Sequence, residues 1–204
     1  SMIVASISTL VSTVLGAMLG ILLYRFRFPL KGAYEGMVHL PIVIPEVCMG
    51  VALLAFFAAI KMPLGLTTIT VSHIAFTIPF VAVVIRARMA GFDRSLEEAA
   101  CDLGAGQWQV MRDITLPYLK PGLIAGAMLA FTLSLDDFVI TFFTSGPGST
   151  TFPIKIYSMV RFSVTPEVNA ASTLLIVLTL GLTVVAMWVQ SRGDGGAGAR
   201  KEGA

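Results

Sequence analysis

The sequence predicts an all-helical integral membrane protein. Hydrophobic residues make up 56% of its 204 residues and charged residues only 13%, and the charges are concentrated between long apolar runs. An apolar run of about 18 residues or more is typical of a transmembrane helix, because a helix needs roughly 20 residues to cross the hydrocarbon core. Five runs meet this condition: Met2–Tyr24, Val38–Ile60, Thr67–Ile85, Gly122–Phe143 and Ala171–Gln190. Five spans in so short a chain leave no room for a soluble domain of any size.

The five spans differ in polarity. The first, third and fifth contain no charged residue and are expected to be continuous helices. The second is expected to break at Pro45 and Glu46, because a proline frees a backbone carbonyl that needs a partner from the protein or a cavity. The fourth carries Asp136 and Asp137, which as neighbours on one helix would point about 100° apart. One of them is expected to face a path through the membrane and the other a neighbouring helix or subunit.

The distribution of Lys and Arg predicts the orientation. Eleven of the 14 basic residues follow the first, third and fifth spans, and such an excess is typical of cytoplasmic loops. The loop 86–121 and the C-terminus are therefore expected in the cytoplasm, and Ser1 outside. The first span has neither the charged start nor the cleavage site of a signal peptide. We expect the chain to be a fragment that lacks one further N-terminal span.

The cytoplasmic loop is expected to begin with a short helix. Ser95 and Glu98 fit a capping box at the helix start, and Gly104 stands where a left-handed C-terminal cap belongs. Between them runs an apolar stripe at helical spacing. The stripe consists of Leu96, Ala99, Ala100 and Leu103.

A second short helix is expected over about Gln107–Thr115, ahead of an interruption at Pro117 and Pro121. The pattern leaves two interpretations open. The first helix either docks on another protein, offering small alanines and charge, or covers the end of the bundle as an interfacial helix. Its acidic residues are Glu97, Glu98 and Asp102.

Three carboxylates lie in or at apolar spans, namely Glu46, Asp136 and Asp137, with Ser134 beside the last two. An ionised side chain at membrane depth is costly, so it usually faces a bundle interior or a water-filled path. Carboxylates with aromatic walls bind ammonium groups by ion pairing and cation–π contact. These residues therefore predict a path for a cationic solute such as a polyamine. The alternative is a structural hydrogen bond between helices or a salt bridge to a partner subunit.

Other classes of function lack their characteristic residues. No G-x-x-x-x-G-K-[ST] string is present, so the chain is expected to be neither an ATP-hydrolysing enzyme nor a holder of cofactors. An aspartyl protease needs two converging aspartates, which neighbours on one helix do not provide. His39 and His73 stand alone and are expected to be structural, and Cys48 and Cys101 are not expected to pair. The net charge of +2 gives no reason to expect nucleic acid.

The outward segment 144–170 begins with a turn-rich stretch, and a short helix over Phe152–Phe162 is expected on the outer surface. Its aromatic and charged residues fit either an interface with another protein or anchors among lipid headgroups. These residues are Tyr157, Arg161 and Glu167. The glycine-rich tail Gly193–Ala204 is expected to be disordered.

Several segments resemble one family of transporters. The loop matches the pattern E-A-A, three residues, G, nine residues, I-x-L-P, through Glu98-Ala99-Ala100, Gly104 and 114–117. This pattern resembles the coupling loop of ABC importer permeases. The strings FTLSLDDF (131–138), GP (146–147), PIKIYSMV (153–160) and PEVNA (166–170) are similar to permease subunits of spermidine/putrescine importers, the PotC type. The similarity covers most of the chain from residue 20 onward.

The resemblance implies a MetI-like permease core with six spans in full-length members, five of them present here. It implies a permease domain over residues 1–191, a cytoplasmic tail over 192–204, and a place in the bacterial inner membrane. The implied partners are a second homologous permease, a dimer of ATP-binding subunits that alone bind ATP, and an external solute-binding protein met by the outward segment.

The resemblance also gives the candidate residues their roles. Those expected to couple to the ATPase are Glu98, Ala99, Ala100, Asp102, Gly104, Ile114, Leu116 and Pro117. Those expected on the substrate path are Glu46, Ser134, Asp136 and Asp137, and contact with the binding protein is expected at Tyr157, Arg161 and Glu167. Two alternatives stay open: a permease for iron(III), aminoethylphosphonate or another small solute, and a secondary transporter or channel, which has no need for a folded loop with these spacings.

Overall fold

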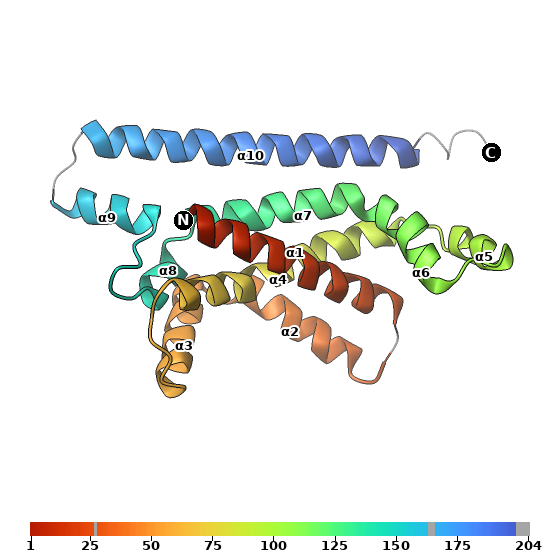
Figure 1. Ribbon diagram of the computed structural model, residues 1–204, viewed down its shortest axis with the longest axis horizontal. Helices are drawn as coiled ribbons and strands as arrows, with labels where there is room; N and C mark the ends of the chain where they lie inside the picture. Colours follow the sequence, from red (N-terminus) through yellow and green to blue (C-terminus); the bar gives the residue numbers. More distant parts are fainter. Residues whose placement is uncertain (27, 163–165, 199–204) are drawn as a thin grey trace.

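The computed structural model describes residues 1–26, 28–162 and 166–198, and within these ranges it consists of helices joined by turns, without strands (Figure 1). Four helical stretches are long and apolar enough to cross a membrane, and a bent pair of helices forms a fifth candidate. The predicted all-helical class is therefore confirmed. The elements are α1 (Met2–Arg25), α2 (Lys31–Val43), α3 (Glu46–Ala59), α4 (Leu66–Ala90), α5 (Ser95–Asp102), α6 (Gln107–Val110), the π-helical turn η1 (Met111–Thr115), α7 (Leu116–Asp136), α8 (Val139–Thr144), α9 (Phe152–Phe162) and α10 (Pro166–Gly198).

The core is a bundle of α1, α4 and α7, which pack against one another. Small residues of α1 allow its close approach to α4. A Cβ on Gly16 would lie 2.6 Å from Cβ of Val81, and one on Gly20 would lie 2.7 Å from the carbonyl oxygen of Ala82. Helices in lipid gain no hydrophobic free energy by associating, so close backbone packing at small residues stabilises the bundle.

Gly16→Ala is expected to destabilise the bundle by about 1–3 kcal/mol, because the added methyl group overlaps Val81 and the carbonyl oxygen of Ile78. Thermal unfolding of the purified protein in detergent measures the effect. Gly36→Ala is the matched control, since a Cβ there would meet no described atom within 4 Å. Equal midpoints for the two variants would contradict the close packing of α1 on α4.

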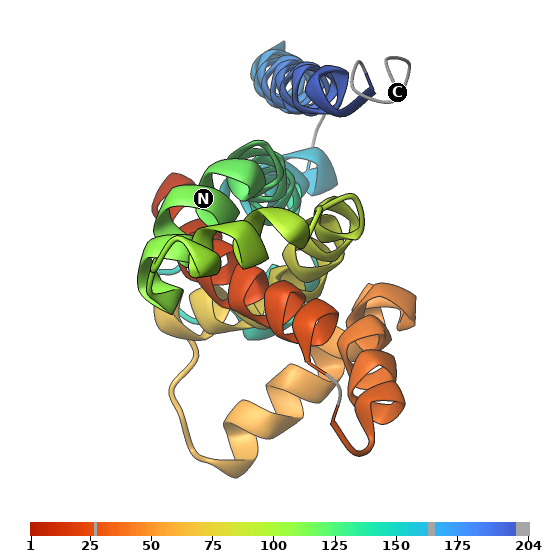
Figure 2. The same ribbon diagram turned by 90° about the vertical axis from the view of Figure 1, so that its right-hand side faces the viewer.

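The second predicted span is broken, as expected at Pro45. Helices α2 and α3 meet at an angle of 107°, with Pro45 as the N-cap residue of α3. Glu46 begins α3, where a carboxylate interacts favourably with the partial positive charge of a helix N-terminus. Figure 2 shows α10 on one side of the bundle and the α2–α3 pair on the other. Helix α3 packs against α8, and a Cβ on Gly50 would lie 2.6 Å from the ring of Phe143.

The fourth span differs from the prediction at both ends. The prolines do not interrupt the helix: the segment 107–136 is helical throughout, because the π-helical turn η1 lets the Leu116 N–H bond to the Met111 carbonyl just before Pro117, which has no N–H. At the other end α7 stops at Asp136. Asp137 has an extended backbone (φ −60°, ψ 123°), so the prediction that both aspartates lie on one helix is wrong.

The last two helices, α9 (Phe152–Phe162) and α10 (Pro166–Gly198), lie at the outside of the bundle. Helix α9 has the predicted bounds Phe152–Phe162, and α10 packs against α7 and α9 (Figures 1 and 2). Because α10 extends to Gly198, the predicted disorder from Gly193 is wrong for residues 193–198. Residues 199–204 lie outside the described chain.

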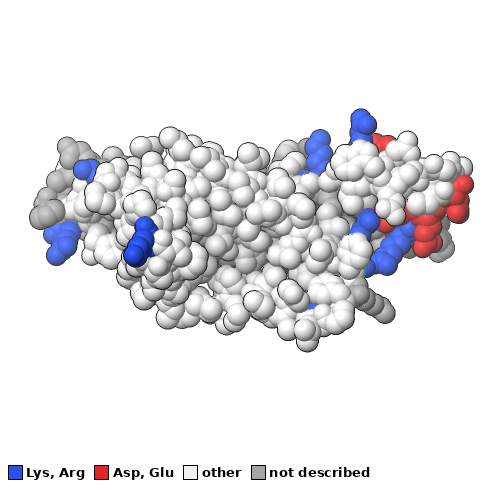
Figure 3. Space-filling model, turned by 60° about the horizontal axis from the view of Figure 1, so that its bottom comes forward, with Lys and Arg blue, Asp and Glu red and all other residues white. Residues whose placement is uncertain are grey.

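Charged side chains mark the two ends of the molecule. Figure 3 shows Asp and Glu at the end that carries α5, with Lys and Arg there and at the opposite end. The face between them is a broad band without charged side chains. This arrangement is that of a bundle with its middle in hydrocarbon and its ends in water.

Candidate functional site

The first candidate surface is α5, at one end of the bundle. Its start differs from the predicted capping box, because the side chains of Ser95 and Glu98 make no capping bonds to the helix start. Instead Oδ1 of Asp93 accepts the Ser95 N–H at 2.9 Å. This backbone bond, together with a side-chain hydrogen bond from Ser95, lowers the pKa of Asp93. Asp93 is therefore the residue that satisfies the first turn.

The C-terminal end of α5 is closed by a Schellman motif. Gly104 has φ +88°, the left-handed conformation that favours glycine, as predicted. The Ala105 N–H bonds to the Ala100 carbonyl at 3.0 Å and the Gly104 N–H to the Cys101 carbonyl at 2.9 Å. The helix therefore ends sharply and keeps the two alanines of the motif in a fixed turn.

The outer face of α5 is open to a partner. No residue of α5 is buried, and Leu103 next to it is 89% exposed, with Trp108 75% exposed nearby. The apolar stripe therefore does not cover the bundle end in this chain, which favours the docking interpretation. Exposed residues of the matched pattern are Glu98, Ala99, Asp102, Gly104, Leu116 and Pro117, whereas Ala100 is half-buried and Ile114 packs against the core.

One acid of the loop is not available to a partner. Glu97 forms an ion pair with Arg25, the last residue of α1, and accepts a hydrogen bond of 2.5 Å from Oγ1 of Thr115. Its side chain is only 18% exposed. The prediction that all three acids face a partner is therefore wrong for Glu97, whose partners lie 72 and 18 residues away in the sequence.

Asp93→Ala is expected to speed amide hydrogen exchange in the first turn of α5, because Ser95 loses its acceptor. A carboxylate whose pKa is lowered on folding stabilises the fold above its unfolded pKa, and this stabilisation is lost as the pH falls through the folded pKa. Glu98→Gln is the control, since Glu98 makes no cap bond. Faster exchange in Glu98→Gln than in Asp93→Ala would contradict the Asp93 cap and support the capping box predicted from Ser95 and Glu98.

The second candidate site lies where the two broken spans meet. Glu46, at the start of α3, and Asp136, at the end of α7, are both exposed and line a cavity of about 300 Å³. The cavity is also lined by Phe76, Leu133, Asp137, Phe138 and Val139. Three carboxylates, two of them exposed, and two phenyl rings line this cavity, which matches the chemistry that binds an ammonium group.

Asp137 itself is held in a buried network (it is 8% exposed). Its Oδ2 accepts the Thr141 N–H and hydroxyl, each at 2.8 Å, and lies 3.3 Å from Nε2 of His73. His73 also meets Oγ1 of Thr141 at 2.8 Å and Oγ of Ser134 at 2.7 Å. Ser134 in turn meets Oγ of Ser8 on α1 at 2.9 Å. The network joins α1, α4, α7 and α8, and Asp137 also caps the first turn of α8.

The network changes the interpretation of two residues. The expectation that His73 stands alone is wrong, since its partners are 61 to 68 residues away. Sequence reasoning missed it because only the alignment of polar residues in three separate spans could have revealed it. Ser134 is 3% exposed and is not among the residues that line the cavity. His39 bonds to the Glu35 carbonyl at 2.6 Å, which agrees with a structural role.

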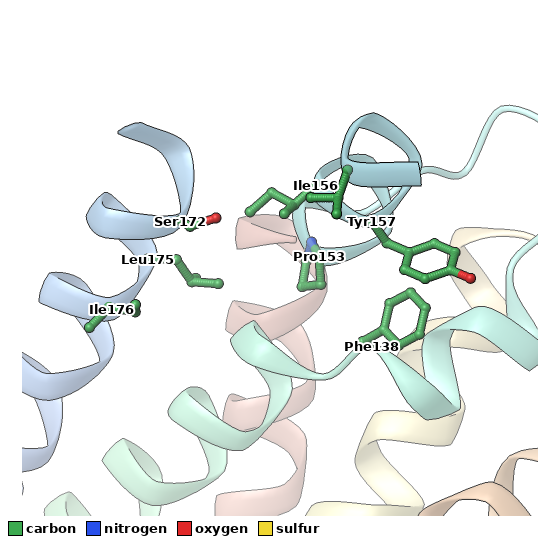
Figure 4. A pocket seen from close by; sticks show the side chains of 8 residues that line it. Phe138, Pro153, Ile156, Tyr157, Ser172, Leu175 and Ile176 are labelled. Atoms are coloured by element: carbon green, nitrogen blue, oxygen red, sulfur yellow. The ribbon is translucent and has the colours of Figure 1, made fainter. Parts of the chain in front are cut away.

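The outward residues lie near α9. The ring of Tyr157 packs on Phe138, with 4.8 Å between centroids, and is 48% exposed. Figure 4 shows Tyr157 and Phe138 beside an apolar groove of about 340 Å³ between α9 and α10. Arg161 is exposed near the end of α9, and the side chain of Glu167 lies outside the described residues. Contact of the three with a binding protein stays a prediction.

Comparison with known proteins agrees with this architecture. Residues 12–194 match the family model described as binding-protein-dependent transport system inner membrane component. The chain is 39% identical over 199 residues to the spermidine/putrescine transport system permease protein PotC of Shigella flexneri, covering 96% of this chain and 75% of that protein.

Further relatives are named for putrescine or for other substrates. The putrescine transport system permease protein PotI of Escherichia coli (strain K12) is 40% identical over 201 residues, covering 95% of this chain and 72% of that protein. The molybdenum transport system permease protein ModB of the same strain is 31% identical, covering 93% and 88%. The MetNI methionine ABC transporter, solved in inward-facing conformations, has a chain with a TM-score of 0.74, 20% identity and coverage of 93% and 91%. The chain belongs to the family of binding-protein-dependent transport system inner membrane components and is a permease of an ABC importer.

Proposed function

We propose that this chain forms part of the membrane path of a polyamine importer and is driven by a separate ATPase that seats α5. The observation that carries the proposal is the exposed helix α5, which bears the E-A-A pattern and is closed by a left-handed Gly104. In this proposal α5 and the C-terminus lie in the cytoplasm, where most of the basic residues stand. ATP is hydrolysed by the partner, since this chain has no phosphate-binding loop.

The proposed cargo follows from the cavity and from the relatives. A polyamine carries ammonium groups on methylene chains, which suit Glu46 and Asp136 with the rings of Phe76 and Phe138. The relatives named for spermidine and putrescine are 39–40% identical to this chain. Iron(III), another cation, is the second candidate, because carboxylate oxygens are ligands that hard cations prefer. A second permease of similar fold and an external binding protein complete the assembly.

The test is uptake by the assembled complex in vesicles. The chain is purified with its ATP-binding subunit and second permease, reconstituted with the solute-binding protein, and supplied with labelled spermidine. ATP-dependent uptake that unlabelled putrescine competes away is the expected result. ATP-driven uptake of iron without uptake of spermidine would contradict the proposal that the cargo is a polyamine. A gradient-driven flux without a copurifying ATPase would contradict the importer mechanism and favour a secondary transporter.

A further inference from the structure

The end of α1 holds α5 through two side-chain contacts. Arg25 pairs with Glu97, as described above, and its Nη2 also lies 3.1 Å from Oγ1 of Thr115. One residue earlier, the ring of Tyr24 lies 5.5 Å from the guanidinium carbon of Arg94, which is the N-cap residue of α5. Adjacent residues of α1 therefore hold both the cap and the first turn of the exposed helix.

The three-way contact is partly shielded from water. Thr115 is fully buried, and the side chains of Arg25 and Glu97 are 25% and 18% exposed. The Thr115 hydroxyl donates to the same Glu97 oxygen that the guanidinium reaches. Charge-assisted bonds of this kind fix geometry more strongly than exposed ion pairs do. Arg25 also stands at a helix C-terminus, where a cation is favourable.

The contact joins three elements that otherwise meet weakly. The main backbone neighbours of α5 are α6 and η1, whereas α1 packs along α4 and α7. At its other end α1 carries Ser8, whose hydroxyl meets Ser134 of the Asp137 network. Arg25 is 17 positions after Ser8, which is about 25 Å along the helix. Helix α1 thus contacts both α5 and the polar network that holds Asp137, one of the residues that line the cavity.

We propose that Arg25, Glu97 and Thr115 form a joint that transmits movement of α5 to α1, with Glu97 and Arg25 as positioning residues for coupling. The inference rests on the proposed function, since it assumes that an ATPase moves α5. A displacement of α5 then pulls on α1 through the ion pair and reaches the polar network around Asp137 through Ser8. Without the joint, α5 moves against η1 alone and ATP is hydrolysed without a matching movement of the membrane helices.

The test measures spermidine transported per ATP hydrolysed by the complete complex in vesicles. Arg25→Glu and Glu97→Arg are each expected to lower this ratio roughly fivefold or more, within the usual range of coupling between sites. The double variant, which restores an ion pair of opposite sense, is expected to recover most of it. Asp113→Asn is the matched control, because it removes an exposed carboxylate from the same loop and should leave the ratio unchanged.

A milder variant tests the same contact if the charge-reversal variants Arg25→Glu and Glu97→Arg do not assemble into the complex. Glu97→Gln keeps the shape and the acceptor for Thr115 but removes the charge, and it is expected to raise hydrogen exchange in α5 above that of Asp113→Asn. Unchanged exchange together with a wild-type transport ratio would overturn the joint. If Gly104→Val lowers the ratio while the Arg25 and Glu97 variants do not, only this inference fails. If neither Gly104→Val nor the joint variants change it, the proposed coupling through α5 fails.

Discussion

Gly104→Val is expected to abolish most coupled transport while leaving the membrane bundle folded. Gly104 has φ +88°, and holding a non-glycine residue in that region costs about 1–3 kcal/mol, with a β-branched residue at the high end. The Schellman bonds at the end of α5 would open, and Ala99 and Ala100 would lose their fixed turn. The transport ratio of the reconstituted complex is expected to fall roughly tenfold, with ATP hydrolysis continuing.

Two variants separate backbone strain from added bulk. Gly106→Val introduces the same side chain two residues away, where φ is −72° and the nearest side-chain atom to an added Cβ is 3.8 Å distant. It is expected to couple normally. Gly104→Asn is expected to retain most coupling, because asparagine tolerates the left-handed region. An unchanged transport ratio in Gly104→Val would contradict the proposal that α5 forms the interface with the ATPase.

Asp136→Asn and Asp137→Asn are expected to fail in different ways. Asp136 faces the cavity, so its loss removes one ammonium contact and is expected to raise the spermidine KM roughly tenfold, about 1.4 kcal/mol, without changing stability. Asp137 accepts bonds from the Ile140 and Thr141 N–H groups. Asparagine would turn an NH₂ group toward one of these donors, which is expected to cost about 1–3 kcal/mol of stability.

Thermal unfolding and uptake kinetics, measured on the same preparations, separate the two effects. His73→Leu is expected to behave as Asp137→Asn does, since it leaves Ser134 and Thr141 without their shared partner. Asp113→Asn serves as the control for loss of one carboxylate. Wild-type spermidine uptake by both aspartate variants would exclude these carboxylates from the transport path.

Patterns that are local in the sequence were sufficient for the local structure. The break at Pro45, the left-handed Gly104 and the bounds of α9 all depend on residues within one or two turns, and all agree with the structure. The capping box failed for a local reason as well. In a capping box the Glu98 side chain would accept the Ser95 N–H. The Asp93 carboxylate, two residues before Ser95, accepts this N–H instead, and the Ser95–Glu98 pattern takes no account of Asp93.

Contacts between distant segments were beyond the same reasoning. The break after Asp136 is hidden in an apolar run, because nothing in the sequence says that Asp137 will turn its carboxylate back to the N–H groups of α8. The partners of His73 and Glu97 come from other spans, so they depend on how the helices are arranged. The sequence therefore identifies the acidic residues of both candidate sites, but it does not show which of them are exposed and which are held by other side chains.

The π-helical turn has a consequence for chain length. Such a turn contains one residue more than an α-helix would need. Deleting one residue within Met111–Thr115 is therefore expected to convert the turn into regular α-helix and to leave the segments on either side close to their present orientation. The same deletion within the α-helical part of α7 would turn everything before it by about 100° and draw it about 1.5 Å closer along the axis. The π-helical turn is thus the place in this long helix where the loss of a residue would least change the direction in which α5 faces.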